Sequence, residues 1–265
     1  MNEGVIPITN LQLAFSIVLV LLAGGVSAAL RLGLLKSLLW GTIRTVAQLT
    51  LIGYALVYIF ALENLPLVIV IILFMCAIAA RTASRHTKDS LGGSGVLAFI
   101  ALLASTFLVG TIVVVLIIGP EPWYSARIAI PIFGMILGNS MNGIALSLDR
   151  LYSEVRARTG EIEALLTFGA TPWEAVRDCI RKAMRAGMTP TVNSLMVVGL
   201  VSLPGMMTGQ ILGGVDPVEA VRYQIVVMLM IAAAVALGCL LLVGMSYRRL
   251  FNRDGALIRE VRGSR

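Results

Sequence analysis

The sequence predicts an all-α, polytopic integral membrane protein. Apolar residues make up 58% of the 265 residues and charged residues only 13%, whereas a soluble domain carries about a quarter charged residues. Apolar runs recur along the chain, and each is close to the roughly 20 residues that a bilayer crossing needs. The length suits one membrane domain, residues 1–265, without a separate soluble module.

The apolar runs predict about seven transmembrane helices. The first begins near Leu11 and is read as a span, because the preceding residues lack the basic segment of a cleaved signal peptide. The spans are expected at residues 10–30, 40–61, 65–81, 96–118, 125–148, 190–212 and 221–245.

The distribution of positive charge predicts the orientation. All but two of the 21 Lys and Arg residues, the exceptions being Arg127 and Arg222, lie in four segments: 31–44, 81–95, 149–189 and the tail from 246. Cytoplasmic loops are the ones enriched in these residues. We therefore expect an N-terminus outside and a C-terminus in the cytoplasm, in a plasma membrane such as the bacterial inner membrane. The net charge of +7 follows from this arrangement and needs no nucleic acid.

Residues 150–187 form the one long segment predicted to be both helical and water-facing. Within it, residues 163–175, hereafter the elbow, indicate a helix, a break and a second helix. Gly169 suits the position just past a helix end, where φ is often positive. Thr171 and Glu174 match a capping box, with Pro172 at the first helical position. An apolar face is expected from four residues of this segment: Leu165, Phe168, Trp173 and Val176.

The elbow resembles the cytoplasmic coupling loop of ABC transporter permeases. That loop carries a Glu-Ala-Ala…Gly pattern, which Glu163, Ala164 and Gly169 match, with Leu165 in place of the second Ala. Three further stretches narrow the resemblance: residues 44–49, 138–143 and 202–210. Together, from about residue 30 to residue 247, the chain resembles the FetB-type permease family, which comprises bacterial iron exporters and plant relatives that act in aluminium tolerance.

This resemblance implies a membrane-spanning subunit that works as a homodimer with a separate ATP-binding subunit. ATP and Mg would bind to that partner, and iron or a metal complex would be exported, with a nucleotide sugar as the alternative substrate. Residues 150–187 would be the coupling region, and the residues expected to contact the ATPase are Glu163, Ala164, Phe168, Gly169, Thr171, Pro172, Trp173 and Glu174. The sequence contains no GxxxxGK[ST] motif, so we expect no nucleotide site, no cofactor and no enzyme activity in this chain.

Polar residues inside the spans are candidates for a transport pathway. Asn139 and Asn142 lie three residues apart, on one helical face of the fifth span, where Gly134 and Gly138 have a spacing typical of close helix packing. Amides at membrane depth either bond to a neighbouring helix or face water. Both roles, interhelical contact and pathway lining, stay open for the two asparagines.

The sixth span contains a predicted break at Pro204 and Gly205, because Pro removes a backbone hydrogen bond and Gly loosens the next turn. Broken helices often mark transport pathways, although a structural kink alone is the simpler reading. Asn193, Ser194 and Gln210 are the polar groups that this span would offer to a partner. In the second span, Arg44 and Gln48 lie one turn apart, and Arg44 either extends to the interface or contacts an anionic ligand.

The sequence offers no cluster of metal ligands, so any metal site is unknown. The single histidine, His86, lies among Arg and Lys, and Cys76, Cys179 and Cys239 are far apart and read as reduced structural thiols. Two other function classes stay open: an ATP-independent secondary transporter or channel, and a membrane scaffold that presents the elbow to another partner.

Overall fold

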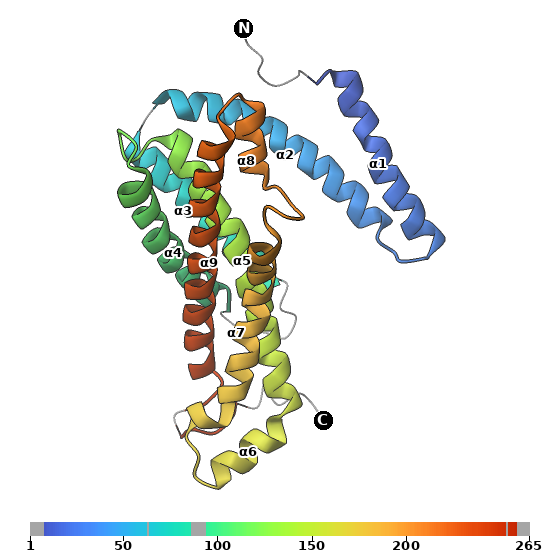
Figure 1. The fold of residues 1–265 in the computed structure, drawn as a ribbon. Coiled ribbons are helices and arrows are strands. Elements are labelled where there is room, and N and C mark those ends of the chain that lie inside the picture. Colours follow the sequence, from blue (N-terminus) through green and yellow to red (C-terminus); the bar gives the residue numbers. More distant parts are fainter. Residues whose placement is uncertain (1–7, 63, 86–93, 253, 259–265) are drawn as a thin grey trace. The chain divides into compact units, whose positions relative to one another are not determined.

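A computed structural model describes residues 8–62, 64–85, 94–252 and 254–258, and over these residues the chain is helical almost throughout (Figure 1). The elements follow one another as α1 (Asn10–Ala29), α2 (Leu35–Leu62), α3 (Leu65–Arg85), α4 (Ser94–Thr111), the π-helix η1 (Ile112–Ile118), α5 (Ala126–Ala157), α6 (Thr159–Thr167), α7 (Pro172–Val197), α8 (Gly205–Leu212) and α9 (Pro217–Arg248). In these ranges β-structure is limited to two isolated bridges. The predicted all-α class is confirmed.

Six of the helices are long and apolar enough to cross a membrane, counted over the described residues. They are α1, α2, α3, α4 with η1, α5 and α9, and they coincide with six of the predicted spans. The main differences lie at the ends: α2 begins at Leu35 and α5 continues to Ala157. The chain is thus a multi-pass membrane protein.

The span predicted over residues 190–212 is not one continuous helix. Helix α7 ends at Val197, and α8 begins only at Gly205. Between them the backbone turns through Gly199, whose φ is +81°, and Val198 forms an isolated bridge with Ser202. The break predicted near Pro204 is present, but helical structure ends earlier than that proline. The number of crossings and their orientation stay predictions.

The chain divides into two units of internal contacts. The first comprises Met1–Glu63 with Gln210–Val215. In it, α1 starts with a capping box between Thr9 and Gln12 and is joined to α2 by a turn in which Leu34 N donates to Ser27 Oγ at 3.1 Å. None of the residues of α2 is buried. Its apolar surface is therefore available to lipid or to other protein.

The second unit, Asn64–Gly209 with Asp216–Arg265, is a helical bundle built around α5. Helices α3, α7 and α9 pack on α5, and α4 packs between α3 and α9. Phe107 of α4 lies edge-on to Phe133 of α5, with 5.5 Å between ring centroids, at the end where α4 finishes and α5 starts. The opposite end of the bundle carries α6, the start of α7 and the segment after α9. The elbow and the described residues that follow α9 thus lie at the same end of the bundle.

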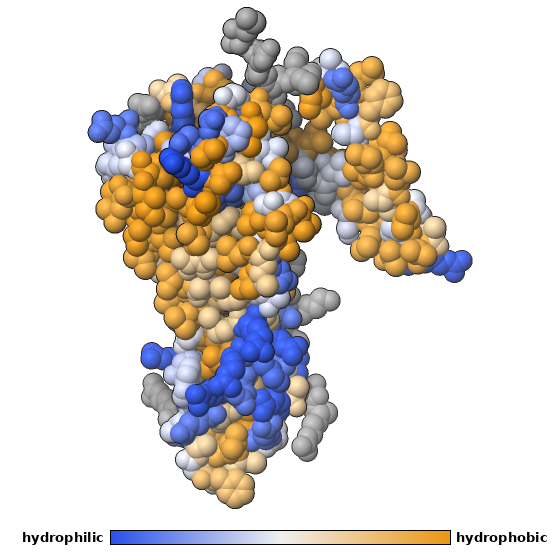
Figure 2. Space-filling model, viewed as in Figure 1, coloured by the Kyte–Doolittle hydropathy of each residue, from blue (hydrophilic) through white to orange (hydrophobic). Residues whose placement is uncertain are grey.

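The polarity of the surface also differs between the two ends of the bundle. Hydrophilic surface gathers over the part of α7 next to α6 (Figure 2), where Arg177, Asp178, Arg181, Lys182 and Arg185 are exposed. The half of the bundle away from α6 presents mainly apolar surface in the same view. This pattern fits a helix end that projects from the bilayer into water.

Candidate functional site: the elbow

The elbow turns sharply between α6 and α7 by a Schellman motif. Ala170 N donates to Leu165 O at 3.0 Å and Gly169 N donates to Leu166 O at 3.1 Å, so two carbonyls at the helix end are satisfied. Gly169 has a φ of +89°, a conformation that costs any residue with a Cβ about 1–2 kcal/mol. The positive φ predicted for Gly169 is confirmed.

The predicted capping box at the start of α7 is formed in both directions. Thr171 N donates to Glu174 Oε2 at 2.8 Å, and Glu174 N donates to Thr171 Oγ1 at 3.3 Å. The Thr171 hydroxyl and backbone N–H hold the pKa of the Glu174 carboxyl below its ordinary value. Pro172 occupies the first helical position. With both helix ends satisfied, the elbow has a fixed shape although it is water-facing.

The apolar residues of the elbow do not form a single face. Phe168 at the tip is 89% exposed and Trp173 is 46% exposed. Val176, in contrast, is fully buried in the core, so the apolar residues expected to form one face are divided between the surface and the core. The physical reason is that α7 turns Val176 toward α5 and α9. Trp173 packs edge-on against Tyr247 of α9, with 5.3 Å between ring centroids.

A buried carboxylate joins α5 to α7 close to the elbow. Glu154 is 8% exposed, accepts a hydrogen bond from Lys182 Nζ at 2.8 Å and pairs with Arg150 at 2.5 Å. The hydrogen bond from Lys182, with the positive charge of Arg150 and Arg158, lowers the pKa of this carboxyl against the opposing effect of burial. Sequence reasoning missed this link, because its partners lie far apart in the chain.

Farther from the elbow, α5, α7 and α9 cross at small residues. A Cβ at Gly187 would meet Ser147 Oγ and, at 2.6 Å, Gly143 O; Cys239 Sγ would lie 2.9 Å away. Gly143 and Gly187 therefore approach each other closely, and a Cβ at Gly143 would lie 3.1 Å from Gly187 O. The predicted pair Gly134 and Gly138 behaves differently: a Cβ at Gly134 would lie 3.1 Å from Met75, whereas one at Gly138 would meet nothing within 4 Å.

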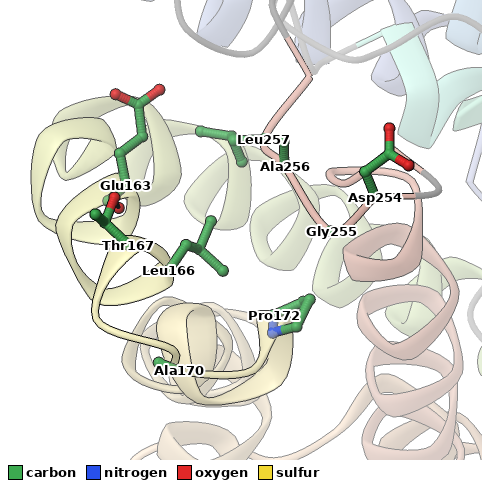
Figure 3. A pocket seen from close by; sticks show the side chains of 9 residues that line it. All are labelled: Glu163, Leu166, Thr167, Ala170, Pro172, Asp254, Gly255, Ala256 and Leu257. Carbon is green, nitrogen blue, oxygen red and sulfur yellow. Dashed lines mark hydrogen bonds between the residues drawn. The ribbon is translucent and has the colours of Figure 1, made fainter.

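The segment after α9 folds back beside the elbow. Between them lies a groove of about 520 Å³, lined by Glu163, Leu166, Thr167, Ala170, Pro172 and, on the other wall, residues 254–257 (Figure 3). Sequence reasoning used this tail only for its charge. Its Asp254-Gly255 dipeptide is a turn signal that could have indicated the fold-back.

The candidate pathway residues are distributed over both units. In the second unit, Asn139 and Asn142 of α5 and Asn193 of α7 are exposed. The side chain of Asn139 donates through Nδ2 to Met135 O of its own helix at 2.8 Å. Pro204 precedes α8 and Gly205 begins it. The first unit holds the others. Arg44 and Gln48 occupy exposed positions of α2. Gln210 belongs to α8, and its backbone carbonyl accepts a hydrogen bond from Val215 N. Their roles stay predictions.

Metal ligands are not gathered in the part of the chain that the structure describes, where no three His, Cys, Asp or Glu residues come together. His86 lies outside the described residues. The metal site therefore stays unassigned.

Comparison with known proteins settles the family. Residues 10–251 match the model of "Uncharacterised protein family (UPF0014)". The chain belongs to the UPF0014 family. The match covers α1 to α9, so the helical bundle and the elbow both lie within the UPF0014 region.

Relatives of this UPF0014 chain are found in bacteria and plants. It is 42% identical over 230 residues to UPF0014 membrane protein slr1647 of Synechocystis, covering 86% of this chain and 88% of the relative. It is 37% identical over 251 residues to Escherichia coli "Probable iron export permease protein FetB", covering 95% of each chain. Arabidopsis thaliana "Protein ALUMINUM SENSITIVE 3" is 35% identical over 221 residues, which are 83% of this chain and 80% of the relative. No solved structure matches. The resemblance to FetB-type permeases and their plant relatives is confirmed.

Proposed function

We propose that this chain is the membrane-spanning permease subunit of an ABC transporter, driven by a separate ATP-binding subunit. The observation that carries the proposal is the elbow: a capped, rigid helix-turn-helix that presents an almost fully exposed Phe168 beyond the membrane-type bundle. A soluble partner that changes conformation when it binds ATP needs an exposed contact surface of this kind to move the membrane helices. The eight coupling residues from Glu163 to Glu174 are the contact surface in this proposal.

Movement of the elbow reaches the membrane through α7. Helix α7 is continuous from Pro172 to Val197, and the hydrogen bond between Lys182 and Glu154 ties it to α5. The small-residue crossing at Gly187 then gives α5, α7 and α9 a close contact about which the helices can tilt. ATP and Mg bind to the partner subunit, and two copies of this chain form the membrane part.

The proposed cargo is iron or a metal complex that leaves the cytoplasm. Its support is the name of the E. coli relative, "Probable iron export permease protein FetB". A nucleotide sugar is the alternative substrate. An ATP-independent transporter or channel is the alternative function, for which the asparagines on the exposed face of α5 would be the pathway.

The experiment that tests the function uses the full chain co-expressed with an ABC-type ATP-binding subunit, which the proposal expects an adjacent gene to encode. The two are purified together, reconstituted in liposomes and supplied with ATP and candidate metals, chelates or nucleotide sugars. The proposal expects a stable complex whose ATP hydrolysis is stimulated by the cargo and which moves that cargo only with ATP. Transport by the purified chain alone, without ATP, would overturn it in favour of the alternative.

A further inference from the structure

The segment that follows α9 is folded against the elbow, although nothing in the coupling pattern includes it. We propose that residues 250–252 and 254–258, hereafter the C-terminal turn, hold the elbow in its coupling position and are part of the transmission between the ATPase and the membrane. This inference rests on the proposed function for its transport consequence. Its structural part, that the C-terminal turn fixes the elbow, stands independently.

Buried side chains attach the C-terminal turn to the bundle. Leu250 is fully buried and Leu257 is 3% exposed, and both belong to the buried cluster that includes Ile162 of α6 and Val176 of α7. Release of the segment would expose both of these apolar side chains to water, so their burial favours the folded-back position.

The C-terminal turn has a definite internal structure of its own. Asn252 Oδ1 accepts hydrogen bonds from Asp254 N at 3.0 Å and from Ala256 N at 2.8 Å, while Asn252 N donates to Ala256 O at 2.9 Å. Ile258 N donates to Leu250 O at 2.9 Å, and this hydrogen bond joins the two ends of the C-terminal turn. Gly255 has a φ of +77°, a backbone conformation that would be strained in a residue with a side chain. The side chain of Asn252 is therefore the centre of this turn.

The C-terminal turn lies against the helix start that forms the second half of the elbow. A Cβ at Gly255 would lie 3.6 Å from Pro172 Cγ, and Trp173, the next residue of α7, packs on Tyr247 just before the turn. Figure 3 shows the consequence: the elbow forms one wall of the groove and residues 254–257 the other. A force on the elbow is thus shared between α7 and the end of α9.

Three variants of the full chain test this role. Asn252→Leu removes the acceptor of two backbone hydrogen bonds, whereas Asn252→Asp keeps an oxygen acceptor at the same place and is the matched control. Gly255→Val disturbs the same turn through its backbone conformation instead of its hydrogen bonds. The two disruptive substitutions disturb the turn in different ways. The same result in both variants would therefore show that loss of the turn is the cause, and not some other effect of one substitution.

The first measurement is hydrogen–deuterium exchange of the purified chain in detergent, which needs no ATPase. Residues 160–172 are expected to exchange about tenfold faster in Asn252→Leu and Gly255→Val than in the wild type, because local opening of the elbow is easier once the turn is lost. Asn252→Asp should exchange at nearly the wild-type rate. Unchanged exchange of residues 160–172 in both disruptive variants would overturn the proposal.

The second measurement is made on the complex with the ATP-binding subunit. In Asn252→Leu, the amount of cargo moved per ATP hydrolysed should fall severalfold while the complex still co-purifies, and Asn252→Asp should restore it. If exchange rises but transport per ATP stays at the wild-type value, the coupling role is refuted. If the wild-type chain binds no ATPase at all, the proposed function fails, and the exchange result still decides whether the C-terminal turn fixes the elbow.

Discussion

The hydroxyl of Ser147 on α5 occupies the space that a Cβ at position 187 of α7 would need. The two helices can approach this closely because residue 187 is a glycine, and Gly143 and Cys239 complete the contact. The crossing lies between the elbow and the break that follows Val197. A crossing this tight leaves no room for α7 to move closer to α5 without repacking of the side chains between them.

Gly187→Ala should destabilise the bundle. The added methyl meets both a backbone carbonyl and a side chain, and overpacking of this kind costs about 1–3 kcal/mol. The measurement is thermal unfolding of the purified chain in detergent. The control is Gly244→Ala on α9, where a Cβ would meet nothing within 4 Å; equal unfolding temperatures for the two variants would contradict a tight crossing.

Gly169→Val should uncouple ATP hydrolysis from transport without removing the protein from the membrane. Valine at a φ of +89° is strained by at least about 1–2 kcal/mol, so the elbow should change shape at its proposed contact with the ATPase. Glu163→Lys, which reverses a charge on the elbow, should act in the same direction. Hydrolysis and transport are measured on the reconstituted complex, and normal transport in both variants would show that the coupling assignment is wrong.

Thr171→Ala should loosen the start of α7 by about 1 kcal/mol, the usual cost of losing an N-cap side chain. The amides of residues 173–175 should then exchange faster with deuterium. Thr189→Ala is the matched control on the same helix, because its hydroxyl bonds only to Arg185 O within the helix and caps nothing. Equal effects of the two substitutions would refute a specific capping role.

Glu154 should make stability depend on acid pH. Its pKa in the folded chain lies below the unfolded value, so its contribution is complete above the unfolded pKa and is lost as the pH falls below about 4. Glu154→Gln should cost on the order of 1 kcal/mol at pH 7, since Lys182 is half exposed and the pair is partly screened. The difference in stability between Glu154→Gln and the wild type, hereafter the gap, should become smaller toward acid pH.

The measurement is thermal unfolding between pH 7 and about pH 2, so that the range includes the interval below the unfolded pKa in which the contribution of Glu154 is lost. Asp178→Asn, which breaks an exposed pair with Arg181, is the control and should show a much smaller gap from the wild type at every pH. A gap for Glu154→Gln that stays constant across the range would contradict the link between α5 and α7.

The sequence predicted those features that neighbouring residues determine. The apolar runs located six helices, and Gly169, Thr171 and Glu174 located the elbow, because caps and turns depend on residues a few positions apart. The link between Glu154 and Lys182, the contact of Gly187 with Ser147 and the burial of Val176 could not be predicted, since each depends on how α5, α7 and α9 meet in space. The sixth predicted span failed as a single helix because Gly199 already ends the helical backbone before Pro204 is reached.

Helix α7 has 26 residues, which at 1.5 Å per residue make a rod about 39 Å long. The rod starts at the exposed elbow, contains Pro190 and ends where the backbone unwinds at Val198. A proline inside a helix removes one backbone hydrogen bond and is a common site of kinking, so a push along the axis meets a point of bending at Pro190 before it reaches the unwound segment. The places where this helix can bend are therefore set by Pro190 and by its end, both far from the elbow.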